Sequence, residues 1–115
     1  MEKIVESQAK PAEKIGIIDL GSNSARLVIV QLFGDNHFMV VDELKESVRL
    51  GQDMERDGFL KPTRVAETVR TLKMFKKLAD ASRVDRIIAV ATAAVRRAKN
   101  QRSFLDEIQA TCGIK

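Results

Sequence analysis

Residues 15–30 read IGIIDLGSNSARLVIV, and this stretch decides the fold of the chain. A nearly continuous apolar run over 15–20 is typical of a central strand covered on both faces. It contains Asp19 and leads into a turn of small residues, Gly21-Ser22-Asn23-Ser24, which Arg26 and a second apolar strand follow. Such a turn can bring backbone N–H groups to a phosphate, and a carboxylate beside it can hold a metal ion. The segment therefore predicts a phosphate-binding turn between two strands.

The composition indicates one domain with an aliphatic core. The chain has 115 residues, 44% of them hydrophobic and 31% charged, with five Phe and neither Trp nor Tyr. Residues 1–14 carry charges throughout and lack the apolar centre of a secretory signal, so we expect a flexible leader. The lone Cys112 cannot form an internal disulfide, which favours a reducing cytoplasm, and its helical spacing predicts a packing role. No apolar run is long enough to span a membrane.

Charge is divided unevenly between the two halves of the chain. Residues 1–60 hold 7 Lys/Arg and 11 Asp/Glu, a net of −4, whereas residues 61–115 hold 13 and 5, a net of +8. The basic half fits an anionic partner, and the alternative is a set of solvated helix faces. Nucleic acid is disfavoured, because aromatic stacking residues are scarce and no nucleic-acid-binding motif is present.

Turn signals and periodicity predict an alternation of strands and helices. Loop residues fill 47–58 with room for a short helix, Pro62 suits the first turn of a helix, and Gly113 suits a helix C-cap. The expected elements are strands at 15–20, 27–33, 37–44 and Arg86–Ala91, a helix at 62–82 and a last helix capped by Asn100 or Ser103. The order β-β-β-α-β-α, with a right-handed crossover that makes the fourth strand parallel to the first, predicts an α/β ribonuclease-H-like half-domain.

Asp19 and the turn are the first candidate site residues. A carboxylate near the end of an apolar strand suggests a magnesium site, and the alternative is an Asp that caps its own turn. The glycine and hydroxyls of 21–24 suit phosphate, and the alternative is an ordinary hairpin turn. Both this turn and ATAAVR (91–96) are expected at the ligand-binding edge of the sheet, although they lie far apart in sequence.

Three arginines extend this candidate site. Arg26 could make bidentate contacts to a phosphate with its planar guanidinium, and the alternative is an ion pair with Asp42 or Glu43 on the neighbouring strand. Arg49 and Arg96 lie in loop positions, where solvated Arg is the alternative. His37 is expected to be an exposed turn residue without a carboxylate partner.

These motifs together resemble the exopolyphosphatase/guanosine-pentaphosphate phosphohydrolase (Ppx/GppA) family of the actin/sugar-kinase/Hsp70 superfamily. The resemblance rests on DLGSNS from Asp19, VRLG (48–51), the 58–60 step before a helix and ATAAVRRAKNQRSFL (91–105), in that order and spacing. It covers residues 15–115, as the N-terminal part of a first ribonuclease-H-like domain.

The resemblance implies hydrolysis of the terminal phosphoanhydride of inorganic polyphosphate or guanosine pentaphosphate, with Mg²⁺ stabilising charge on the transferred group. Asp19 would hold the metal. The implied phosphate-binding residues are Gly21, Ser22, Asn23, Ser24, Arg26, Thr92 and Arg96. Family members continue with an essential Glu, a second glycine-rich phosphate loop and a second domain, all expected beyond Lys115. Asp106 and Glu107 do not replace that Glu, because they are expected to be solvated helix residues.

Two principal hypotheses follow from these expectations. The chain is an N-terminal fragment of a hydrolase with half an active site and little turnover, or it is a stand-alone module that binds phosphate or nucleotide or mediates oligomerisation. An open sheet edge, which would pair with missing sequence or with another copy, favours the fragment.

Overall fold

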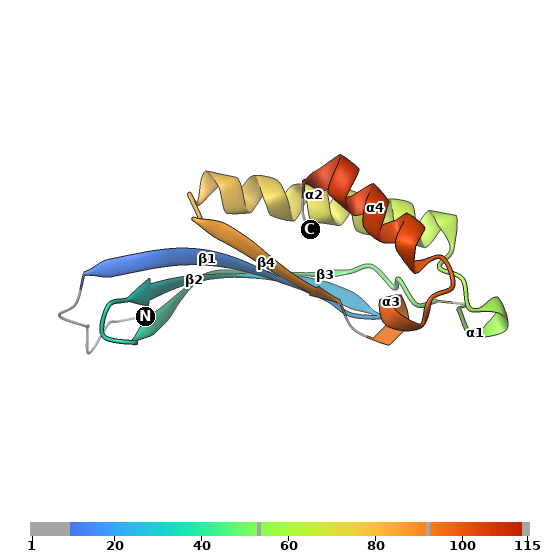
Figure 1. Cartoon of the computed structure of the whole chain (residues 1–115), viewed down its shortest axis with the longest axis horizontal. Coiled ribbons are helices and arrows are strands. Elements are labelled where there is room, and N and C mark those ends of the chain that lie inside the picture. The colour runs from blue at the N-terminus through green and yellow to red at the C-terminus, as the bar shows by residue number, and fades with distance from the viewer. Residues whose placement is uncertain (1–9, 53, 92, 114–115) are drawn as a thin grey trace.

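The fold is a four-stranded sheet with helices packed on one face (Figure 1). The structure is a computed structural model, and it describes residues 10–52, 54–91 and 93–113. Its elements are β1 (Pro11–Leu20), β2 (Ser24–Phe33), β3 (Phe38–Ser47), α1 (Met54–Asp57), α2 (Pro62–Ala81), β4 (Arg86–Ala91), α3 (Ala93–Arg97) and α4 (Gln101–Cys112).

The sheet order, β3-β2-β1-β4, confirms the predicted topology. β1, β2 and β3 form an antiparallel meander, and β4 returns parallel to β1 after the α2 crossover. This arrangement is a ribonuclease-H-like half-domain. The ends of β1 and β4 therefore lie at the same edge, where Leu20 pairs with Ala91.

The first three strands are longer than predicted. β1 begins at Pro11, so residues 11–14 of the expected leader belong to the sheet, where Glu13 and Arg86 form a 2.6 Å ion pair. β2 takes in Ser24 and Arg26, and β3 continues to Ser47. The polar ends escaped prediction because backbone pairing, rather than apolar side chains, holds them in the ladder.

The core lies between the sheet and the two long helices. Figure 1 shows α2 and α4 side by side above the sheet. Alternate residues of β1 and β2 face them, including the fully buried Ile18 and Ile29, and Phe75 of α2 fills the space between. Cys112 is also buried, and its thiol donates to the carbonyl of Val69 at 3.8 Å, which confirms the predicted packing role. No described helix is long and apolar enough to cross a membrane.

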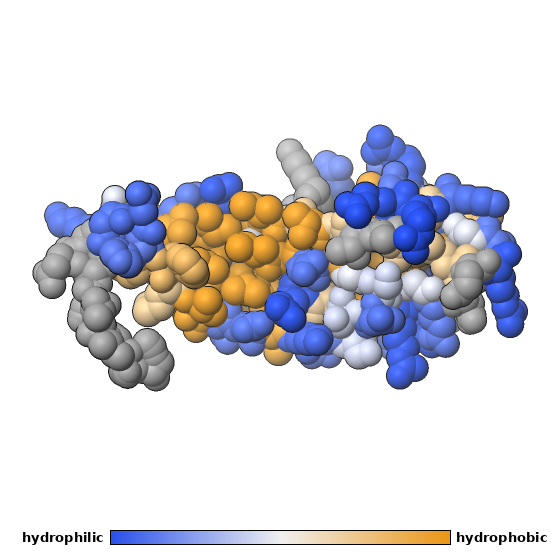
Figure 2. All heavy atoms as spheres, turned by 90° about the horizontal axis from the view of Figure 1, so that it is seen from below, coloured by the Kyte–Doolittle hydropathy of each residue, from blue (hydrophilic) through white to orange (hydrophobic). Residues whose placement is uncertain are grey.

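Much of the opposite face of the sheet is apolar, and no described helix covers it. Figure 2 shows this face as a continuous hydrophobic area over the strands. Val40 of β3 is 51% exposed, and Ile88 and Val90 of β4 are 37% and 49% exposed. The sequence predicted a first strand covered on both faces, and the described residues cover one of them.

Asn100 joins the start of α4 to the segment before α2. It occupies the N-cap position, as predicted, but its side chain makes no hydrogen bond to its own helix. Instead, its amide accepts from the backbone N–H of Leu60 at 2.9 Å and donates to the Leu60 carbonyl at 3.1 Å. Sequence reasoning assigned a local cap because it cannot detect a partner 40 residues away.

We expect Asn100→Ala to lower the free energy of unfolding by about 1–3 kcal/mol, because two backbone groups of the buried Leu60 lose their partner. Urea unfolding followed by circular dichroism measures the loss. Asn100→Ser is the discriminating control, since Ser is a good N-cap but is too short to make both bonds. Full stability in Asn100→Ser would show that local capping, rather than the bridge to Leu60, is what matters.

Candidate phosphate-binding site

Two loops that are remote in sequence are hydrogen-bonded to each other at one end of the sheet. The carbonyl of Asn23, in the turn after β1, accepts from the backbone N–H groups of Val48 and Arg49 at 3.0 and 2.9 Å. The carbonyl of Ser22 accepts from the N–H of Gly51 at 2.9 Å. These three bonds fix the turn against the VRLG segment.

Gly51 brings in the third segment, at the start of α3. A Cβ placed on Gly51 would lie 3.3 Å from the Cβ of Ser22 and 3.4 Å from the Cβ of Ala94. Only a glycine lets the three segments approach this closely without displacing a neighbour. The sequence expected the DLGSNS and ATAAVR segments at one edge of the sheet, and this contact places their residues on either side of Gly51.

A pocket of about 890 Å³ opens where these segments meet. Its polar lining comes mainly from the turn and the VRLG loop, and two arginines, Arg49 and Arg97, are among the lining residues. The described residues of the lining are Ser22, Asn23, Ser47, Arg49, Gly51, Gln52, Met54, Gly58, Ala94 and Arg97. Among the described residues, the lining has two cations and no carboxylate, so it favours an anionic ligand.

Arg49 is presented to the pocket by its neighbours. Val48 and Leu50, on either side, are 1% and 0% exposed, so they anchor the loop in the core while Arg49 stays exposed. Its backbone adopts φ +49°, a left-handed conformation that is uncommon for a residue other than glycine. The bond from its N–H to Asn23 and the bond its carbonyl accepts from Gln52 at 3.0 Å hold this conformation.

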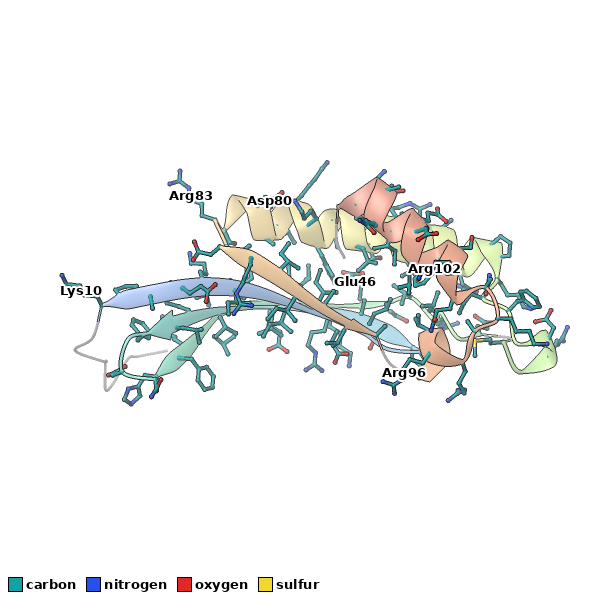
Figure 3. The ribbon with its side chains drawn as sticks, viewed as in Figure 1. Lys10, Glu46, Asp80, Arg83, Arg96 and Arg102 are labelled. Carbon is teal, nitrogen blue, oxygen red and sulfur yellow. The ribbon has the colours of Figure 1, made fainter. Side chains whose placement is uncertain are left out.

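Arg97, rather than the predicted Arg96, lines the pocket. Arg96 is exposed, and Figure 3 shows it projecting from α3 beyond the edge of the sheet. The sequence contains the adjacent pair Arg96-Arg97, and one residue of helical rotation decides which side chain turns to the pocket. The sequence therefore showed that an arginine lies at this position, but only the placement of α3 shows which of the two lines the pocket.

The turn itself keeps donors available for a ligand. Within the described residues, no hydrogen bond uses the backbone N–H of Ser22 or Asn23. Gly21 donates to the carbonyl of Ser24 at 2.9 Å, which closes the turn. Ser24 is the first residue of β2 and pairs with Ser47, so the turn proper is one residue shorter than predicted.

Asp19 and Arg26 lie outside the lining of this pocket. They face each other across β1 and β2 on the uncovered side of the sheet, and Asp19 is exposed. Asp19 therefore lies on an exposed face of a strand that the sequence predicted to be covered on both faces. Nε of Arg26 is 3.5 Å from Oε2 of Glu43, which is the strand-to-strand pairing that the sequence left as an alternative.

The remaining predicted residues have varied positions. Thr92 lies outside the described residues. His37 is exposed, as predicted, but its Nδ1 is 2.9 Å from a carboxylate oxygen of Asp35, a partner that the sequence analysis missed. Asp106 is exposed on α4, 3.7 Å from Arg102, and Glu107 is exposed as well.

The described residues contain no group of three or more His, Cys, Asp or Glu that could enclose a metal ion. Mg²⁺ does not require such a cage, because it commonly binds through one or two carboxylates, waters and the phosphates of its ligand. An exposed Asp19 fits that type of shared site. The donor set is thus compatible with magnesium that arrives with a phosphorylated ligand.

Comparison with known proteins adds an independent line of evidence. Residues 28–115 match the Ppx/GppA phosphatase family. The chain is 35% identical over 103 residues to a guanosine-5'-triphosphate,3'-diphosphate pyrophosphatase of Pseudoalteromonas atlantica, which covers 89% of this chain and 20% of that protein. It is 26% identical over 102 residues to exopolyphosphatase 1 of Mycobacterium tuberculosis, which covers 89% of this chain and 30% of that protein.

The fold agrees with the same group of proteins. The crystal structure of a Ppx/GppA family member from Aquifex aeolicus superimposes with a TM-score of 0.84 at 37% identity, over 90% of this chain and 34% of that one. The chain thus spans about a third or less of the length of the proteins compared here.

Proposed function

The chain belongs to the Ppx/GppA phosphatase family, and on that premise we propose that its pocket binds the terminal phosphates of inorganic polyphosphate or guanosine pentaphosphate for hydrolysis of the phosphoanhydride. The observation that carries the proposal is the convergence of the turn, the VRLG loop and α3 on one cationic pocket. The relatives named above support the choice of a phosphoanhydride substrate.

The backbone N–H groups of the turn and the two arginines of the lining would have different roles in this function. The free N–H groups of Ser22 and Asn23 would donate to phosphate oxygens, as small-residue turns do in other phosphate sites. The guanidinium groups of Arg49 and Arg97 would hold the chain of phosphates and stabilise negative charge on the group that is transferred. Water attacks the terminal phosphorus in line with the leaving phosphate oxygen.

Magnesium completes the proposed chemistry. Asp19 would hold the ion together with waters and substrate phosphates. When bound, Mg²⁺ supplies charge neutralisation for the phosphoryl group. Arg26 lies across from Asp19, where it could contact the phosphates on the metal side once it leaves Glu43.

Turnover would require more polypeptide than this 115-residue chain provides. The described residues that line the pocket include no carboxylate, so they offer no general base to activate water. The much greater length of the relatives leaves room for that group and for an opposite wall. The chain by itself would therefore bind phosphates and release little or no phosphate from polyphosphate.

The test is binding of tripolyphosphate to Arg49→Gln/Arg97→Gln, measured by titration calorimetry. We expect affinity to fall roughly 100-fold, because each charge-assisted contact contributes about a factor of ten. A matched control, Lys61→Gln/Arg102→Gln, removes two cations outside this pocket that pair with Asp57 and Asp106. Equal weakening in both double variants would overturn the proposed pocket, because it would mean that only net charge attracts the ligand.

A further inference from the structure

A second cationic groove lies between α2 and the end of α4. Its volume is about 560 Å³ and its lining is Arg70, Lys73, Met74, Lys76, Lys77, Thr111 and Cys112. None of these residues lines the pocket described above. The two helices that form the groove pack side by side above the sheet (Figure 1).

Within the part of the chain that the structure describes, three of the four cations form no ion pair. Nζ of Lys76 is 2.9 Å from a carboxylate oxygen of Asp80, at the end of α2 (Figure 3). No ion pair among the described residues includes Arg70, Lys73 or Lys77, and the groove lining contains no acid. Outside this lining, Glu107 of α4 is the acid whose charge acts on the Cys112 thiol.

The Cys112 thiol, which also lines the groove, does not offset the positive charge of the lysines and Arg70. Burial raises the pKa of the Cys112 thiol, and the nearby Lys73 ammonium only opposes that rise. The thiol therefore stays neutral at physiological pH. The positive charges of the lining are therefore concentrated around an uncharged Cys112 thiol.

The spacing of the unpaired cations suits an extended ligand. Arg70, Lys73 and Lys77 are separated by three and four residues, so they share one face of α2. At 1.5 Å per residue they span about 10 Å along the helix, more than one phosphate group can contact. The lining contains no aromatic side chain on which a nucleic-acid base could stack. This combination favours a polyanion without bases.

We propose that the groove between α2 and α4 is a second binding site, which holds an internal stretch of an inorganic polyphosphate chain through Arg70, Lys73 and Lys77. The choice of inorganic polyphosphate among polyanions rests on the proposed function, whereas the groove and its charge do not. The groove would keep a long chain attached while its end occupies the first pocket. It would therefore confer a preference for long chains over short ones.

The test compares long-chain polyphosphate with tripolyphosphate on the 115-residue chain and Arg70→Gln/Lys73→Gln/Lys77→Gln. We expect the triple variant to lose about tenfold in affinity for the long chain, with a shallower salt dependence, since three exposed charge contacts disappear. Tripolyphosphate affinity should not change. The matched control is Lys61→Gln/Arg64→Gln/Arg102→Gln, which removes three cations that pair with acids elsewhere.

Each outcome separates the groove from the first pocket. Unchanged long-chain affinity in the groove variant, or equal loss in the control, would overturn the groove. Single-stranded RNA that binds as tightly as polyphosphate and is lost in the same variant would also overturn it. Loss of tripolyphosphate binding in Arg49→Gln/Arg97→Gln bears only on the first pocket. If Arg49→Gln/Arg97→Gln still binds long-chain polyphosphate, and this binding is lost when Lys73 is also replaced, the result would support the groove alone.

Discussion

Leu50→Ala is expected to lower the free energy of unfolding by about 2–5 kcal/mol, because it leaves a cavity beneath the VRLG loop. Leu50 is 0% exposed and belongs to the main core cluster. Domains of this size are stable by only about 5–15 kcal/mol, so the loss would be a large share of the total. Leu50 also positions its neighbours Arg49 and Gly51, and tripolyphosphate binding should weaken in the same variant.

Urea unfolding at constant m-value measures this effect. Leu105→Ala is the matched control, since Leu105 on α4 is 38% exposed and its truncation should cost less than about 1 kcal/mol. Leu50→Met keeps the volume of the side chain and should cost less than about 1.5 kcal/mol, so the comparison survives even if Leu50→Ala does not fold. Similar losses in Leu50→Ala and Leu105→Ala would contradict the burial of Leu50.

The architecture could be predicted because its signals are local and repeated. Apolar runs bounded by small-residue turns marked the strands, and Pro62 and Gly113 marked helix ends at the positions where the structure has them. The parallel return of β4 followed from the handedness of crossovers. The polar strand ends, such as Lys14 and Ser47, were missed because ladder hydrogen bonds leave no trace in hydrophobicity.

The site was predictable as a set of segments but not as a set of side chains. The turn, VRLG and ATAAVR do converge, since a Cβ added to Gly51 would meet both Ser22 and Ala94. Which of the two arginines lines the pocket depends on the rotation of α3, and Arg97 is the one that does. Asp19 is exposed because residues alternate along β1, a consequence of register that no motif contains.

The uncovered face of the sheet agrees both with the apolar strands in the sequence and with the greater length of the related proteins. Strands that are apolar on both sides belong to sheets covered on both sides. Exposed Val40, Ile88 and Val90 show where a covering layer is absent among the described residues. The longer relatives have the polypeptide that such a layer needs. The surface and the lengths together support the proposal that this chain acts as part of a larger protein.

Gly51→Val is expected to abolish measurable tripolyphosphate binding and to lower the free energy of unfolding by about 1–3 kcal/mol, through overpacking. A Cβ at Gly51 already lies 3.3 Å from Ser22 and 3.4 Å from Ala94, and the two extra methyl groups of Val would force the segments apart. Gly51→Ala should be milder, because neighbours need to move by only a few tenths of an ångström.

Gly113→Val is the control that separates crowding from a general effect of replacing glycine. Gly113 has φ +72° and no atom within 4 Å of its added Cβ, so its cost is backbone strain at a helix end far from the pocket. It should lose stability without losing tripolyphosphate affinity, which calorimetry measures directly. If Gly51→Val binds tripolyphosphate as wild type does, the contact of Gly51 with the turn and α3 does not build the phosphate site, because the pocket would then tolerate separation of its walls.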